Sequence, residues 1–162
     1  MKAVATSPAR VAARARRDLA RMARPAGVFD ASRYFRGADH LGFYNVGTKP
    51  MRALAKDIYR AHRWIWSVDD GLAFADALIG DRYLEVKGVG IEVMACYRRD
   101  FTPWLLPAWK RWLARGHSSN WATTDAICGS LVGPLLVRYP ALVREVSGWA
   151  RDRNMWVRRG PR

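Results

Sequence analysis

Apolar side chains recur every three or four residues along most of this chain, which is the spacing of a helix that buries one face. No segment shows the strict alternation of apolar and polar residues that indicates a half-buried strand. The chain is therefore predicted to be all-α. Helices are expected over about 8–24, 31–36, 69–79, 82–99, 102–115, 119–136 and 139–151, from Pro50 as a first helical residue, and from 154 onward.

The longer predicted helices begin near residues 48, 82, 119 and 154, about 35 residues apart, with a second helix between each pair. This is the period of helical hairpins stacked into an α-solenoid. A compact helical bundle would give much the same pattern. The length of 162 residues predicts a single domain over 1–162, with a basic helix over about 8–24 and repeats over about 28–159.

The charge is strongly positive: 28 Lys and Arg face 14 Asp and Glu, a net charge of +14, and 23 of the basic residues are arginine. Such an excess indicates a polyanionic partner, nucleic acid before membrane. Arginine forms bidentate contacts to phosphate and stacks on flat rings, which favours the same partner.

The first predicted helix carries its arginines on one stripe. Spacing places the apolar Val11, Leu19 and Met22 on another side. Spacing alone does not separate a DNA-contacting stripe from a solvated one, and an Arg-rich start with a single acid is also typical of an organellar transit peptide. The stripe consists of Arg10, Arg14, Arg17, Arg21 and Arg24.

The sequence contains no pattern typical of a metal site, a cofactor site or a membrane-spanning segment. Cys96 and Cys128 have no metal-ligand spacing and are interpreted as reduced thiols of a cytoplasmic protein. The three histidines form no ligand motif, so neither a metal nor a cofactor is expected. No apolar run reaches the roughly 18 residues of a membrane span, and no signal peptide is recognised.

An aspartate stands within the apolar helix predicted over 119–136, which Ser119 or Asn120 would cap. Asp125 lies just outside the apolar stripe and shares an edge of the helix with Trp121, one turn earlier. Spacing alone favours an ion pair between Asp125 and an arginine of a neighbouring helix. The apolar stripe of this predicted helix consists of Thr124, Ile127, Cys128, Leu131 and Leu135.

Two further stretches contain residue types that could bind a ligand. In "NMWVRR", residues 154–159, successive arginines point about 100° apart, so at most one of Arg158 and Arg159 can face the same partner as an Asp or Trp. "KGVGIE", residues 87–92, lacks the third glycine and the preceding strand of a phosphate-binding loop. Gly88 and Gly90 are therefore predicted to be positions of close helix packing.

Taken in order, five stretches resemble the DNA alkylation repair family of AlkD-type DNA glycosylases over roughly residues 30–159. The W-x-x-x-D motif and the W-x-x-R block about 30 residues later are the most specific of them. The five are "YFR" at 34–36, "GTKPMR" at 47–52, "EVKGVGIEVM" at 85–94, "NWATTD" at 120–125 and "NMWVRR" at 154–159.

The resemblance implies a right-handed solenoid of HEAT-like hairpins, with a basic concave groove for duplex DNA that contains alkylated purines. It implies Asp125 as the catalytic carboxylate, with Trp121 as the indole beside the lesion. Arg159 would complete the site beside the DNA backbone. The remaining candidate DNA-binding or lesion-binding residues are Tyr34, which matches a groove-lining aromatic, Trp156, and Arg158, where the family does not require arginine.

The activity implied is hydrolysis of the N-glycosidic bond of cationic N3- or N7-alkylated purines, without a base-flipping pocket. Family members continue past the W-x-x-R helix for two or more repeats, so a C-terminally truncated member is expected here. A catalytically silent DNA-binding repeat protein is the alternative. A scaffold unrelated to DNA agrees least with the charge.

Overall fold

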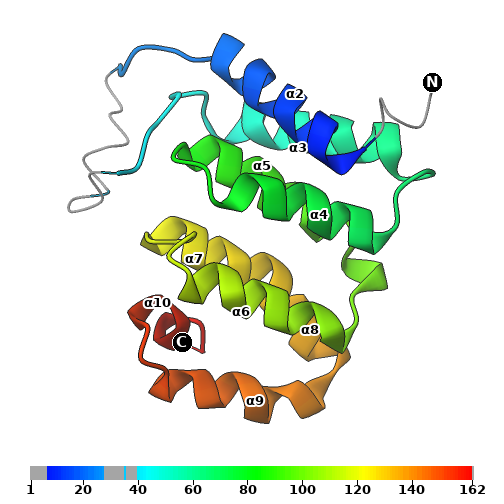
Figure 1. Cartoon of the computed structure of the whole chain (residues 1–162), viewed down its shortest axis with the longest axis vertical. Helices are drawn as coiled ribbons and strands as arrows, with labels where there is room; N and C mark the ends of the chain where they lie inside the picture. Colours follow the sequence, from blue (N-terminus) through cyan, green and yellow to red (C-terminus); the bar gives the residue numbers. More distant parts are fainter. Residues whose placement is uncertain (1–6, 28–34, 36–39, 162) are drawn as a thin grey trace. The chain divides into compact units, whose positions relative to one another are not determined.

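The computed structural model describes residues 7–27, 35 and 40–161 (Figure 1). All regular secondary structure in these residues is helical, apart from one isolated bridge between Gly42 and Tyr83. This confirms the all-α prediction. The chain forms two compact units, Met1–Cys96 and Tyr97–Arg162.

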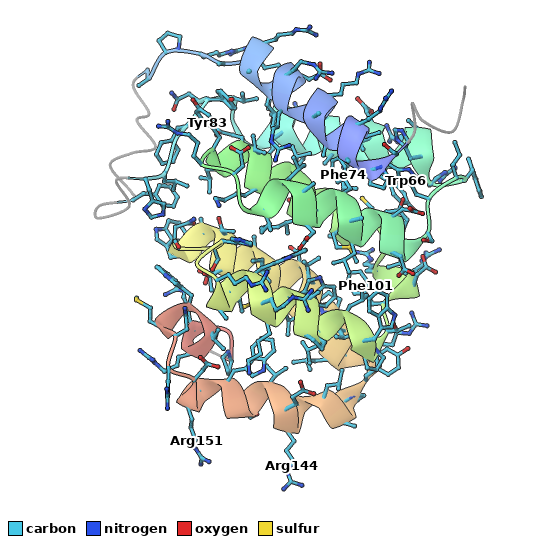
Figure 2. All side chains as sticks on the ribbon, viewed as in Figure 1. Trp66, Phe74, Tyr83, Phe101, Arg144 and Arg151 are labelled. Carbon is cyan, nitrogen blue, oxygen red and sulfur yellow. The ribbon has the colours of Figure 1, made fainter. Side chains whose placement is uncertain are left out.

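The first unit contains four helices: α2 (Pro8–Arg21), α3 (Thr48–His62), α4 (Val68–Ile79) and α5 (Leu84–Cys96). Helix α5 packs against both α3 and α4, and α2 packs mainly on α4. Phe74 of α4 is completely buried, and its ring lies 5.6 Å from that of Trp66, beside it in Figure 2. Helices α2, α3 and α4 each bury one side in a shared core, whereas α5 lies within it, with most of its residues buried.

Two glycines of α5 allow this close packing. A Cβ atom at Gly88 would lie 2.4 Å from the sulfur of Met51 in α3. A Cβ at Gly90 would lie 3.2 Å from Cβ of Leu78 and 3.4 Å from the backbone of Ala75, both in α4. The prediction that the glycines of "KGVGIE" serve helix packing is confirmed.

One narrow apolar side of helix α2 is buried, and this burial fixes how the helix is rotated on the first unit. Val11, Ala12, Ala15 and Leu19 are buried, and Val11 and Leu19 belong to the predicted apolar side. The helix ends at Arg21, earlier than predicted. Arg24 consequently lies outside the helix, where its backbone N–H donates to the carbonyl of Tyr44 at 2.8 Å.

Lys87 is a buried cation that the sequence pattern does not predict. Its side chain is in α5, only 5% of the residue is exposed, and Nζ donates to the carbonyl of Ile79 at the end of α4. Burial lowers the pKa of this ammonium group to about 8, although the charge of Asp81 acts in the opposite direction. The unfolded chain thus binds this proton more tightly than the folded chain does.

Folding stability should consequently rise with pH between about 8 and the ordinary lysine value of about 10.4. We expect Lys87→Met to remove up to about 3 kcal/mol of this pH-dependent stabilisation. The measurement is urea unfolding of both proteins at pH 7.5, 9 and 10.5. If the difference between them does not change with pH, Lys87 is not desolvated in the fold.

The second unit begins with short 3-10 turns at Arg98–Asp100 and Pro103–Leu105. Its regular helices are α6 (Leu106–Ala114), α7 (Trp121–Ile127), α8 (Gly133–Arg138), α9 (Val143–Gly148) and α10 (Met155–Arg159). Further 3-10 turns at Pro140–Leu142 and Trp149–Arg151 flank α9. Phe101, labelled in Figure 2, meets Trp109 edge-on at 4.9 Å in its core. Trp66, Trp109, Trp112 and Trp149 are buried, four of the eight tryptophans in the chain.

Two more predicted helices differ from the structure, in addition to α2. Helix α3 begins at Thr48, so Pro50 is its third residue; a missing N–H costs nothing anywhere in the first turn, which is why proline alone does not fix the start. The predicted helix over 119–136 is interrupted by a π-helical turn, Cys128–Val132. Pro134 lacks an N–H and crowds the preceding turn, and a wider turn accommodates it. The short helix predicted over 31–36 lies outside the described residues except for Phe35.

The predicted period is present in the helix order. Helices α3, α5, α7 and α10 begin at residues 48, 84, 121 and 155, and another helix precedes each of them. Successive starts are therefore separated by 36, 37 and 34 residues.

Candidate functional site

The two helices that carry the candidate site each begin at an asparagine cap. Asn120 is buried, and its side-chain oxygen accepts the N–H of Thr123 at 2.8 Å at the start of α7. Asn154 accepts the N–H of Trp156 at 2.8 Å at the start of α10, and its Nδ2 donates to the carbonyl of Ala114 in α6. The asparagines that begin the "NWATTD" and "NMWVRR" stretches thus fix where these helices start.

Asp125 and Arg159 form a bidentate ion pair between α7 and α10. Arg159 Nε donates to one carboxylate oxygen at 2.7 Å, and Nη2 donates to the other at 2.8 Å. The hydrogen bonds to Asp125 raise the pKa of Arg159. This is the interhelical ion pair that spacing favours for Asp125, and it joins the same two residues that the family resemblance places in one site.

The pair remains open to solvent. The side chain of Asp125 is 50% exposed and that of Arg159 is 38% exposed. Trp121, the first residue of α7, is 44% exposed and stands one helical turn before Asp125. The indole and the carboxylate therefore share one accessible edge of α7, as predicted.

The other candidates are placed differently. Arg158 points away from Asp125, and its Nη1 donates to the carbonyls of Asp152 and Arg153 at 2.9 and 2.8 Å. Only one of the two adjacent arginines thus faces the aspartate, as the 100° rotation per residue predicts. Trp156 is half-buried on α10. Tyr34 lies outside the described residues.

An open cavity of about 560 Å³ adjoins the ion pair. Cys128 is one of the residues that line this cavity. Burial and the neighbouring Asp125 charge raise the pKa of its thiol to about 11. The thiol is consequently protonated and unreactive at neutral pH. The cavity is lined by Asp125, Cys128, Gly129, Val132, Gly133, Leu136, Val143, Val146, Ser147, Arg159, Gly160 and Pro161.

Neither this cavity nor the close packing at Gly160 was predicted from the sequence. A Cβ at Gly160 would lie 3.2 Å from the ring of Trp149 and 3.4 Å from the sulfur of Cys128, so glycine allows the end of α10 to approach both residues. The only signal in the sequence is that a glycine directly follows Arg159.

The described residues offer no group of three or more His, Cys, Asp or Glu side chains that could hold a metal ion. No single helix among them has both the length and the apolar character needed to cross a bilayer. Only the bent combination of Trp121–Arg138 with Pro140–Arg151 passes that test, by length and composition alone.

The exposure of the ion pair predicts a small contribution to stability. In a double-mutant cycle of Asp125→Asn and Arg159→Gln, we expect a coupling of at most about 1 kcal/mol in the free energy of unfolding, because exposed pairs are screened and lose side-chain entropy. Urea unfolding of the four proteins measures it. A coupling of several kcal/mol would identify the pair as a structural tie between α7 and α10.

Comparison with protein families supplies the context for this site. The model of the family described as DNA alkylation repair enzyme matches residues 15–160 and therefore includes both partners of the ion pair. The chain belongs to this DNA alkylation repair family. Searches of curated proteins and of solved structures each returned no match.

Membership in the DNA alkylation repair family gives the chain a role in alkylation repair, supports an enzymatic activity and indicates DNA as the partner. This confirms the family-level prediction from the sequence.

Proposed function

We propose that this protein is a monofunctional DNA glycosylase that releases cationic N3- and N7-alkylated purines from duplex DNA. The observation that supports it is the exposed Asp125–Arg159 pair with Trp121 one turn away, in a chain of the DNA alkylation repair family. The three residues combine a negative charge, a phosphate-binding cation and an aromatic face at one accessible place.

Alkylation at N3 or N7 gives the purine a positive charge, so the base is already a good leaving group and needs no general acid. The sugar is what requires stabilisation, because cleavage of the glycosidic bond develops oxocarbenium-like positive charge at the anomeric carbon. A single carboxylate suits this reaction, in contrast to the carboxylate pair of most glycoside hydrolases.

In this proposal Asp125 stabilises the developing charge and orients the attacking water. The face of an indole attracts cationic groups, so Trp121 holds the charged deoxyribosyl group against the carboxylate. The spacing of one helical turn directs both side chains toward the same target.

Arg159 has two roles in this mechanism. Its bidentate hydrogen bonds fix the orientation of the Asp125 carboxylate. Its partly exposed guanidinium retains Nη1, which makes neither of these two bonds, as a donor for a phosphate beside the lesion. Such a contact positions the duplex without reading its sequence.

Trp156 and Arg158 are proposed as outer DNA contacts, and Tyr34 as an aromatic that lines the groove.

The cavity beside Asp125 lacks one feature that is common in base-flipping pockets. Enzymes that flip a base often stack it on aromatic side chains and read its Watson–Crick edge. The side chains that line this cavity include several aliphatic ones, and none is aromatic. We propose instead that the lesion is approached from the backbone side, along HEAT-like hairpins that form a single solenoid domain with a basic groove.

A catalytically silent DNA-binding protein is the second candidate. It is favoured by the observation that both oxygens of Asp125 already accept hydrogen bonds from Arg159. A carboxylate committed to an ion pair stabilises a transition state less well than one that is available to the sugar.

Measuring duplex binding and base release on the same methylated DNA distinguishes the glycosylase from the silent DNA-binding protein. The glycosylase predicts binding that weakens steeply with salt, together with 7-methylguanine release above the spontaneous rate. Salt-sensitive binding without release would support the silent protein. Absence of duplex binding at low salt would exclude both candidates.

A further inference from the structure

Helix α2 presents four arginines on the side opposite its buried residues. The buried side is fixed, since Val11, Ala12, Ala15 and Leu19 are between 0 and 7% exposed. The four arginines on the other side are all exposed, and they define the α2 arginine face: Arg10, Arg14, Arg17 and Arg21. This face is in the first unit, whereas Asp125 and Arg159 are in the second.

The α2 arginine face has little counter-charge of its own. Asp18 is the only acid in α2, and it lies 3.7 Å from Arg14 and 3.5 Å from Arg21, at the outer limit of an ion pair. Neither Arg10 nor Arg17 has an acidic partner among the described residues. The remaining arginine of the helix, Arg16, is turned inward, where it binds Asp81 at 2.8 Å and the carbonyl of Ala77.

This arrangement works against the stability of the helix. Like charges three and four residues apart repel each other, and a cation in the first turn opposes the positive end of the helix dipole. The first turn contains no acid, and the side chain of Ser7 provides no cap. An external anion along this face would relieve both effects, and the chain itself supplies only Asp18.

From this geometry we infer that the α2 arginine face is a second DNA-binding surface, which holds the sugar-phosphate backbone of duplex DNA whether or not a lesion is present. From Arg10 to Arg21 the helix rises by about 16 Å. Duplex DNA carries one negative charge for about every 1.7 Å of its axis, so this face meets a dense row of phosphates. Arginine matches phosphate geometry through its planar donors.

A membrane surface fits this helix less well. A helix that lies in a lipid interface inserts its apolar side among the acyl chains. The larger apolar side chains of α2 are buried against the helices of the first unit, so the exposed side offers a partner guanidinium groups and short alanine side chains. The repeated charge of a duplex backbone is the better complement.

The test compares two pairs of substitutions in the full chain, binding an unmodified 30-base-pair duplex. One pair is Arg10→Gln with Arg17→Gln. The matched control is Arg144→Gln with Arg151→Gln, which removes the same charge at the same sequence separation from exposed arginines, shown extending outward in Figure 2. Because the duplex contains no alkylated base, the result is independent of whether the protein releases bases.

The α2 pair is expected to weaken binding about 10- to 100-fold at 0.1 M salt and to reduce the slope of log K against log salt by about 2, since each phosphate contact contributes roughly 0.9. The control pair should change affinity less than about twofold. Arg10→Lys with Arg17→Lys, which retains both charges, should preserve the slope, and circular dichroism verifies that each variant is folded.

Equal losses for the two glutamine pairs would overturn the inference, because they would show a general effect of net charge. An unchanged affinity in the α2 pair would overturn it as well. A third result would also overturn it: the wild type binds vesicles of anionic phospholipid, the α2 pair abolishes this binding, and duplex binding is unaffected.

Discussion

Replacement of Asp125 by asparagine is expected to lower the rate of base release from alkylated duplex DNA by about 10²- to 10³-fold, which is typical when one preorganised electrostatic group is removed. The amide keeps the size of the side chain and lacks the negative charge that stabilises the sugar. The rate is measured as 7-methylguanine released under single-turnover conditions.

Two control measurements accompany this substitution. Duplex affinity should change less than about threefold, since a carboxylate repels the backbone and contributes nothing to binding phosphate. The free energy of unfolding should fall by no more than about 1 kcal/mol, since the ion pair is half-exposed. A slow variant that also unfolds readily would assign the effect to structure, and an undiminished rate would remove Asp125 from the mechanism.

A leucine at Gly90 is expected to destabilise the folded 162-residue chain by about 3 kcal/mol, at the upper end of typical overpacking. The first side-chain atom would meet the backbone of Ala75 at 3.4 Å and Cβ of Leu78 at 3.2 Å, and neither can rotate away. The remaining atoms of the leucine would have to separate α4 from α5. Thermal unfolding should shift downward by roughly 6–12 °C.

Gly148→Ala is the matched control, because no atom lies within 4 Å of a Cβ at this position and its φ of −62° suits any residue. We expect it to gain about 0.5–1 kcal/mol from helix propensity. If the leucine variant unfolds at the same temperature as the wild type, the fold does not require the close approach of α4 and α5.

The helices were largely predictable because most of them bury one apolar side against their neighbours. Helix α4 begins within one residue of the predicted start and ends at the predicted residue 79. The π turn at Cys128–Val132 was not predicted, since it depends on how a chain relieves the crowding around Pro134. The burial of Lys87 was missed for a similar reason: it arises from tertiary packing at the end of α4, and local spacing carries no information about it.

The candidate site was only partly predictable from spacing. Spacing placed Asp125 beside Trp121 and favoured an interhelical arginine as its partner, but it could not select one arginine among 23. The family resemblance pointed to Arg159, which is the residue that the structure brings to Asp125. The cavity beside them depends on three separate helical segments and on the absence of a side chain at Gly160, so neither spacing nor motif could reveal it.

Cleavage of the N-glycosidic bond of a cationic alkylated purine is the activity that we propose for this chain. The most direct measurement is a single-turnover reaction of the wild-type protein, in excess, with a duplex that contains one 7-methylguanine, in which free base and abasic sites are quantified together. We expect both products to appear in equal amounts and faster than in duplex without protein. A duplex that is bound by the protein and keeps its 7-methylguanine at the spontaneous rate of loss would contradict it.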